Sequence, residues 1–199
     1  IAMAGPGLPY AEVVVTQVER IAAASGASAE EVAEAVAQQR EVVALAQAEA
    51  WAALEARLIE IATAQIAALP AEQRAQIPDP EALIAQQAAA NVAAFQSPWL
   101  RFFFSYDPRD DLRRITVPVL VLFGELDVQV DVAQNRGPFE AALAEAGNDD
   151  VTVVVVPQAN HLFQQAVTGN VDEYLMLENA FIPGFLDTIS AWVSERFVR

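Results

Sequence analysis

The sequence predicts an α/β protein in which three strands of a parallel sheet flank a large, all-helical insertion. Residues 117–123 and 151–156 are nearly continuous apolar, β-branched runs, which is typical of parallel strands covered by helices on both faces. Between residues 10 and 114, apolar residues instead recur every three or four positions, which is the helical period. We therefore expect a partial sheet core over residues 1–9 and 115–199 and a helical lid over residues 10–114.

The composition limits the possible classes of protein and partner. The 199 residues are 54% hydrophobic and 19% charged, which suits a globular protein with a sizeable core. The formal net charge of −16 argues against nucleic acid and anionic membranes, because both bind through cationic contacts. No segment reaches the roughly 18 apolar residues that a membrane span requires. The absence of cysteine leaves the compartment open.

The first expected strand lies at residues 1–4, where an apolar run precedes Gly5-Pro-Gly7. This pattern is typical of the end of a buried strand that turns into a loop, so we expect the natural chain to begin further upstream. The alternative is a processed protein that begins here with a loose tail. A strand that has lost its neighbour would offer an edge for the missing half or for self-association.

Helix signals follow in order along the expected lid. Helical periodicity begins near residue 10, and the spacing of Ser28 and Glu31 is that of a capping box, so a second helix should start at residue 29. Periodicity does not decide whether residues 29–69 form one helix or two. Asp79 can cap a further helix over residues 81–95. The same alanine-rich stretch could instead be a coiled coil or interaction arm.

The region after the lid predicts one strand–helix–strand unit. Its strands are residues 117–123 and 151–156, its helix is residues 137–145, and a final covering helix spans residues 181–197. These strands should lie side by side and parallel.

A carboxylate and the single histidine of the chain follow these two strands. Asp127 comes after the first and His161 after the second. Because parallel strands end at one edge of the sheet, we expect the two side chains to meet there. Asp127 would then fix the ring tautomer, and the other ring nitrogen would take a proton from a nucleophile. Glu125 and Asp131 are alternative acids, and either aspartate could instead be only a turn or cap residue.

Three phenylalanines and a tyrosine gather in residues 101–109, near the end of the expected lid. They can line an apolar pocket or simply pack the lid, and packing is the commoner use. The candidate substrate-pocket residues are Trp99, Phe103, Tyr106 and Phe163.

Several short motifs occur in a specific order: Ala4-Gly-Pro-Gly7, Ser97-Pro-Trp99, Tyr106-Asp-Pro-Arg109, Gly124-Glu-Leu-Asp127 and Asn160-His-Leu-Phe-Gln164. In this order the chain resembles the C-terminal half of α/β-hydrolase-fold serine hydrolases, close to bacterial esterases with a helical lid. The resemblance covers essentially every residue. It implies the sixth, seventh and eighth strands of the family's sheet, triad roles for Asp127 and His161, and a small-molecule ester or acyl substrate. Peptidases and acyltransferases use the same triad.

The resemblance lacks one part of the family's catalytic machinery. The family's nucleophilic serine lies in G-x-S-x-G on the preceding strand, with the oxyanion hole also upstream, and no such pattern occurs in this sequence. We therefore expect the isolated chain to be inactive and a preceding segment to complete the site. Neither metal nor cofactor is implied, since one histidine and no cysteine leave only scattered carboxylates. The competing interpretations are a non-catalytic helical scaffold and a catalytically dead hydrolase relative.

Overall fold

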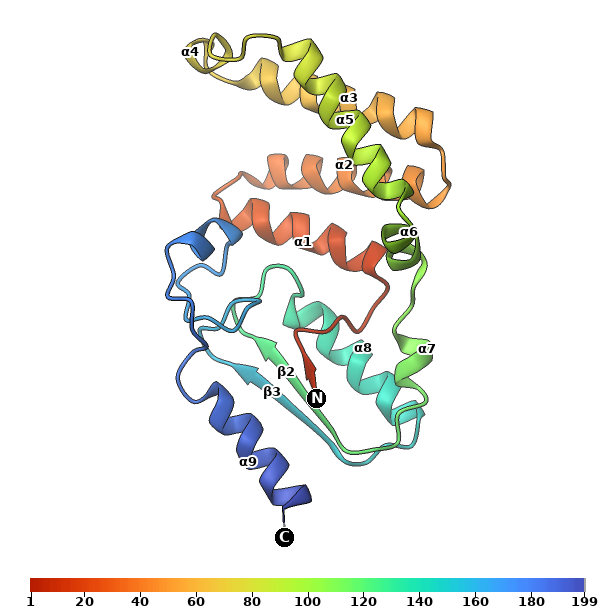
Figure 1. Cartoon of the computed structure of the whole chain (residues 1–199), viewed down its shortest axis with the longest axis vertical. Helices are drawn as coiled ribbons and strands as arrows, with labels where there is room; N and C mark the ends of the chain where they lie inside the picture. Colours follow the sequence, from red (N-terminus) through yellow and green to blue (C-terminus); the bar gives the residue numbers. More distant parts are fainter. Residues whose placement is uncertain (199) are drawn as a thin grey trace. The chain divides into compact units, whose positions relative to one another are not determined.

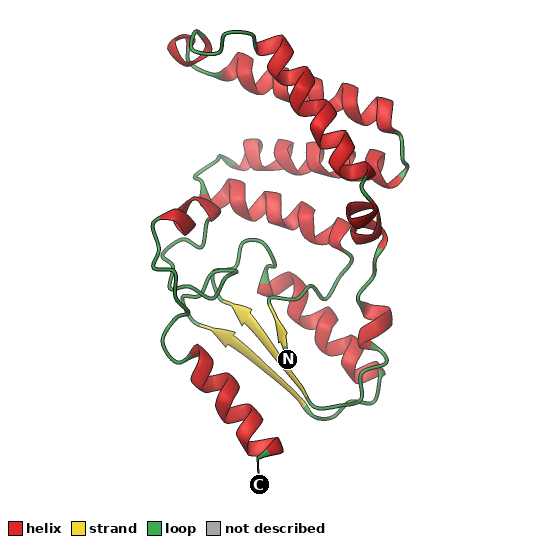
Figure 2. Ribbon diagram, in the orientation of Figure 1, coloured by secondary structure: helices red, strands yellow, loops and turns green. Residues whose placement is uncertain are grey.

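The computed structural model describes residues 1–198 and contains a parallel sheet with helices, so the predicted α/β class is confirmed. Figure 1 shows the elements coloured along the chain, and Figure 2 distinguishes helices from strands. The chain divides into two compact units, one formed by Ile1–Val36 with Asp107–Arg199 and the other by Ala37–Tyr106. The first unit contains the sheet, and the second is helical.

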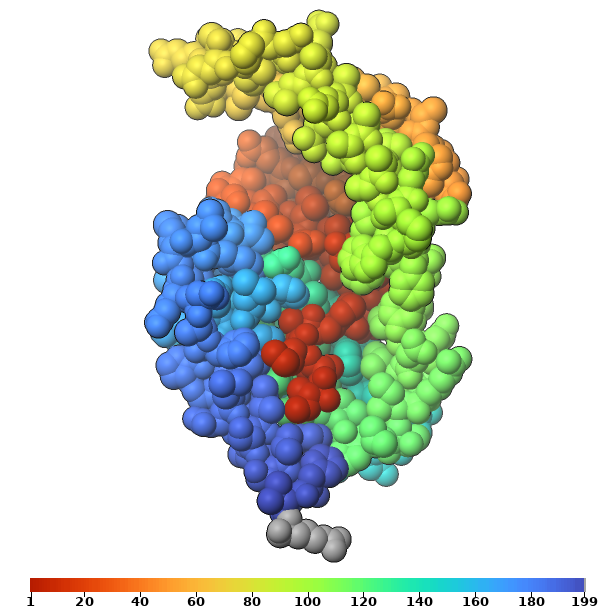
Figure 3. All heavy atoms as spheres, in the orientation of Figure 1, coloured from red at the N-terminus to blue at the C-terminus, as the bar shows by residue number. Residues whose placement is uncertain are grey.

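The three expected strands are present and form one parallel sheet. They are β1 (Ala2–Met3), β2 (Val119–Gly124) and β3 (Val151–Val156), in the spatial order β1-β2-β3. All six residues of β2 are buried, as a central strand covered on both faces requires. The outer edge of β1 pairs with no other strand among residues 1–198, and Figure 3 shows the red N-terminal residues open at the surface.

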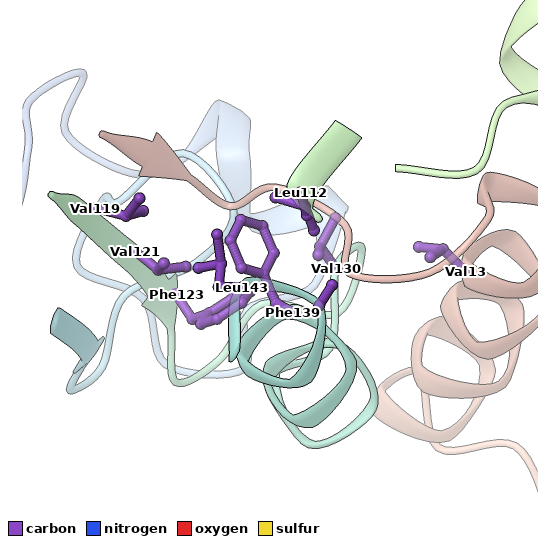
Figure 4. Close-up of a cluster of buried hydrophobic side chains, with 9 residues drawn as sticks. Val13, Leu112, Val119, Val121, Phe123, Val130, Phe139 and Leu143 are labelled. Atoms are coloured by element: carbon purple, nitrogen blue, oxygen red, sulfur yellow. The ribbon is translucent and has the colours of Figure 1, made fainter. Parts of the chain in front are cut away.

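Helices cover both faces of this sheet. Alternate β2 residues, Val121 and Phe123, pack with Leu143 of helix α8 (Val132–Glu145) in one apolar cluster, which Figure 4 shows. The residues between them, Leu120 and Leu122, pack in a second cluster with Phe185 and Trp192 of helix α9 (Phe185–Phe197). The alternation follows from the two-residue period of a strand.

Two helix boundaries differ from the sequence prediction. Helix α8 begins at Val132, five residues earlier than expected, because the Asp131 carboxylate caps it by accepting from the Gln134 amide at 2.8 Å. Helix α9 begins at Phe185 and not at residue 181, since Gly184 lies in the left-handed region with φ of 83°.

Helix α1 (Tyr10–Ala24) belongs to the first unit. Its Val13 is 1% exposed in the core cluster of α8, and its Arg20 forms an ion pair with Asp131 at 3.0 Å. The loop before α1 is held by Asn135, whose Oδ1 accepts from the Gly7 amide at 3.0 Å. Residues 10–114 contain helices and no strand, as expected of the lid. The compact helical unit, residues 37–106, is smaller than that range, because α1 packs with the first unit.

The second unit is built around a small apolar cluster of Val42, Ala46, Leu54 and Val92. The stretch left open as one helix or two forms two, α2 and α3, which are separated by Glu49 with φ of 52°. Asp79 caps α5 as predicted, accepting from the Ala82 amide at 3.0 Å. The remaining elements of the chain are α2 (Ala29–Gln47), α3 (Trp51–Ala68), α4 (Ala71–Arg74), α5 (Pro80–Gln96), α6 (Pro98–Ser105), α7 (Arg109–Leu112) and the 3-10 helix η1 (Val171–Leu175).

Candidate functional site

The carboxylate and the imidazole that follow β2 and β3 are in contact. His161 Nδ1 lies 2.9 Å from Asp127 Oδ2. The Asp127 side chain is fully buried, whereas that of His161 is 28% exposed. The predicted meeting of these two side chains at the carboxyl edge of the sheet is therefore present.

The carboxylate of Asp127 is held by backbone amides. Its Oδ1 accepts from the amides of Gln129 and Val130, each at 2.8 Å. Its Oδ2 is left to the imidazole. Because the two oxygens have different partners, the carboxylate cannot turn without breaking hydrogen bonds in a buried place, which is costly.

The turn that carries His161 is organised by its neighbour Asn160. This side chain is fully buried, and its Oδ1 accepts from the amides of Leu162 and Gln164, each at 2.9 Å. Its Nδ2 donates to Gln164 Oε1 at 3.0 Å. Phe163 has a φ of 56°, a left-handed conformation that needs such support in a non-glycine residue. The imidazole is therefore presented by a rigid turn.

Gly124, the last residue of β2, allows this turn to cross the strand end. A Cβ atom at this position would lie 2.5 Å from the carbonyl oxygens of both Ala159 and Asn160. No real Cβ makes such contacts with backbone atoms. Only glycine therefore lets the chain before His161 approach β2 closely enough to reach Asp127.

The second ring nitrogen of His161 has no hydrogen-bond partner among residues 1–198. A neutral ring that donates from Nδ1 to a carboxylate carries its lone pair on Nε2. This arrangement can accept a proton from a neighbouring group at Nε2, while Asp127 stabilises the imidazolium that forms.

The two alternative acids are engaged elsewhere. Glu125 accepts from the Gln158 amide at 2.8 Å. Asp131 caps α8 and pairs with Arg20. Neither contacts His161, so Asp127 is the acid that the fold brings to the ring.

The four candidate pocket residues do not form one cluster. Trp99 stacks on Phe103 with ring centroids 4.8 Å apart, and Tyr106 stacks on Phe102 at 5.1 Å, all within the second unit. Phe163 lies in the first unit, is 2% exposed and stacks on Phe185 at 4.4 Å, so it packs the core.

A pocket of about 530 Å³ does occur within the second unit, but it is lined by none of the four candidate residues. Phe102 and Phe104 line it, together with Arg101, which is paired with Glu49. These side chains come from the same aromatic segment.

Sequence reasoning missed two polar residues beside the pair. The side-chain Nε2 of Gln129 donates to the hydroxyl of Tyr174, in η1, at 2.8 Å. The only sequence signal for Gln129 is its position two residues after Asp127. Tyr174 has no such signal, because it lies in a segment without helical or strand periodicity. Burial is the largest cause that raises the pKa of Tyr174, and the charge of Asp127 acts in the same direction.

Within residues 1–198, no group of three or more histidine, aspartate or glutamate side chains is placed to hold a metal ion. The helices described there include none with the length and apolar character needed to cross a membrane. Comparisons with family profiles, with curated proteins and with solved structures find no match.

Proposed function

We propose that this chain is the C-terminal portion of a serine hydrolase of the α/β-hydrolase fold, supplying Asp127 and His161 to a Ser-His-Asp triad. The observation that carries the proposal is the 2.9 Å contact between a buried carboxylate and a partly exposed imidazole. Nε2 of His161, which has no hydrogen-bond partner in the described part of the chain, supports it, since a general base needs one ring nitrogen available.

The proposed reaction is acyl transfer. As a nucleophilic hydroxyl oxygen bonds to the carbonyl carbon of an ester, its proton passes to Nε2 of His161. The imidazolium then gives that proton to the leaving oxygen as the ester C–O bond breaks. Water repeats the sequence to release the acid, and Asp127 stays ionised throughout. Neither a metal nor a cofactor takes part in these steps.

The proposal assigns the nucleophilic serine and the oxyanion hole to a segment that precedes β1. The outer edge of β1, which pairs with no strand of the described residues 1–198, supports this, because a further parallel strand could pair there and end at the same edge as β2 and β3. The substrate class is a small-molecule ester or a related acyl compound. Without the preceding segment the same edge could pair with a second copy of the chain.

Asp127→Asn tests the triad role directly. The asparagine oxygen would keep the two backbone amides, so its NH₂ group would face the ring and force Nδ1 to accept. The ring proton would then move to Nε2, which could no longer act as base. ¹⁵N NMR of the single histidine should show this change of tautomer, and kcat of the protein carrying the preceding segment should fall about 10⁴-fold.

Glu125→Gln is the matched control, since it makes the same chemical change in an exposed acid that does not touch the ring. It should leave the tautomer and kcat unchanged. An Asp127→Asn variant with an unaltered tautomer and normal ester hydrolysis would refute the triad role and favour a scaffold.

A further inference from the structure

We propose that Gln129 and Tyr174 are positioning residues that hold the Asp127 carboxylate against His161 through a chain of hydrogen bonds. The inference rests on the proposed function for its catalytic meaning. Its test, however, measures how firmly the imidazole of His161 is held against Asp127 and needs no enzymatic activity.

Gln129 connects the carboxylate to the tyrosine. Its backbone amide donates to Asp127 Oδ1 at 2.8 Å. Its side-chain Nε2 donates to the Tyr174 hydroxyl, also at 2.8 Å. A single residue thereby joins the acid of the pair to a side chain that lies 45 positions further along the chain.

Tyr174 anchors the far end of this chain of contacts. Its hydroxyl accepts from the Gln129 side-chain amide, and burial chiefly raises the pKa of that hydroxyl, so it stays protonated at neutral pH. The contacts run from Tyr174 to the Gln129 side chain, from the Gln129 backbone to Asp127, and from Asp127 to the imidazole of His161.

The segment that carries Tyr174 is itself anchored. Glu173 accepts from the amides of Thr168 and Gly169, each at 2.9 Å, and Asn170 donates to Ser25 Oγ at 2.9 Å. Gly169 has a φ of 75°, and a Cβ there would overlap the carbonyl of Leu126. The tyrosine hydroxyl is thus held from a fixed platform next to the Asp127 loop.

The side-chain amide of Gln129 would lose its partner if this hydroxyl were removed. A polar group left without a partner in a part-buried place is unfavourable, so the Gln129 side chain would turn toward water. The Asp127 loop would then open more often, and the carboxylate would separate from the imidazole during each opening. The geometry needed for proton transfer would be populated less.

Tyr174→Phe in the 199-residue chain tests the inference by NMR. The exchange of the His161 Nδ1 proton with water should become about three- to tenfold faster, the factor that one lost hydrogen bond gives, and the Nδ1-protonated tautomer should decrease. Tyr10→Phe, which removes a hydroxyl elsewhere in the same unit, is the control and should change neither quantity. Unaltered exchange and tautomer in Tyr174→Phe would overturn the inference.

Gln129→Leu provides a second variant. It keeps the backbone amide that donates to Asp127 and removes only the side-chain amide that donates to Tyr174. If the two residues act through one contact, the double variant Gln129→Leu/Tyr174→Phe should exchange no faster than the more affected single variant. Fully additive effects would contradict a role through this shared contact. The expected NMR changes in a complete protein that hydrolyses no ester would support positioning while removing the proposed function.

Discussion

His161→Ala lowers kcat of the protein that carries the preceding segment by about four to six orders of magnitude. The reason is that Nε2 is the proton acceptor of the proposed triad, and loss of one member removes the joint action of all three. The midpoint of thermal unfolding should fall by only a few degrees, because the ring is partly exposed and packs little core, while its loss removes the partner of the buried Asp127 Oδ2. Initial rates with a p-nitrophenyl ester and a thermal melt measure both quantities.

The control for this variant is Val167→Ala, which truncates a side chain that is 84% exposed in the chain that follows His161. It should retain ester hydrolysis close to that of the wild type. If His161→Ala retained more than about a hundredth of the activity, general base catalysis of the usual size by this ring would be excluded.

Gly124→Ala destabilises the first unit by about 2–3 kcal/mol, the usual cost of forcing an added methyl group into a filled space. The new Cβ would meet the carbonyl oxygens of Ala159 and Asn160 at 2.5 Å, and backbone atoms cannot turn away as a side chain can. The strand end and the His161 turn must therefore separate. Urea unfolding should report the loss of stability, and the tautomer signal of His161 should show the loss of Asp127.

Gly137→Ala is the matched control for this change. Gly137 lies in α8 with nothing beyond its chain neighbours within 4 Å of an added Cβ, so the cost of alanine there is limited to crowding against the ring of Pro138, and this variant should lose less stability than Gly124→Ala. Equal unfolding midpoints for Gly124→Ala and the wild type would show that the close approach is not required.

Elements specified by short-range signals could be predicted from the sequence. The Ser28 and Glu31 capping box is present, with the Ser28 amide donating to Glu31 at 2.7 Å. The two β-branched runs form β2 and β3. The strand β2 is buried along its whole length, as an uninterrupted apolar strand covered on both faces requires, whereas β3, last in the strand order, is half-buried up to Val156. The meeting of Asp127 and His161 followed from topology alone.

Features decided by tertiary contacts could not be predicted. Helix α1 has the same periodicity wherever it packs, and it is tertiary contacts, Val13 in the core cluster and the Arg20–Asp131 ion pair, that place it in the first unit. The start of α8 depends on Asp131 acting as its N-cap. From the sequence alone, the same aspartate could equally be interpreted as a catalytic acid. The Gln129–Tyr174 contact joins residues 45 positions apart, and no spacing rule covers it.

The most direct test of the central claim is covalent labelling of the protein that carries the preceding segment, using a fluorophosphonate and peptide mapping by mass spectrometry. Such reagents trap a hydroxyl that a neighbouring base activates. We predict one modified serine, located before residue 1 of this sequence, and loss of that adduct in His161→Ala. An adduct that forms equally without His161, or one on any of the six serines within these 199 residues, would contradict the account.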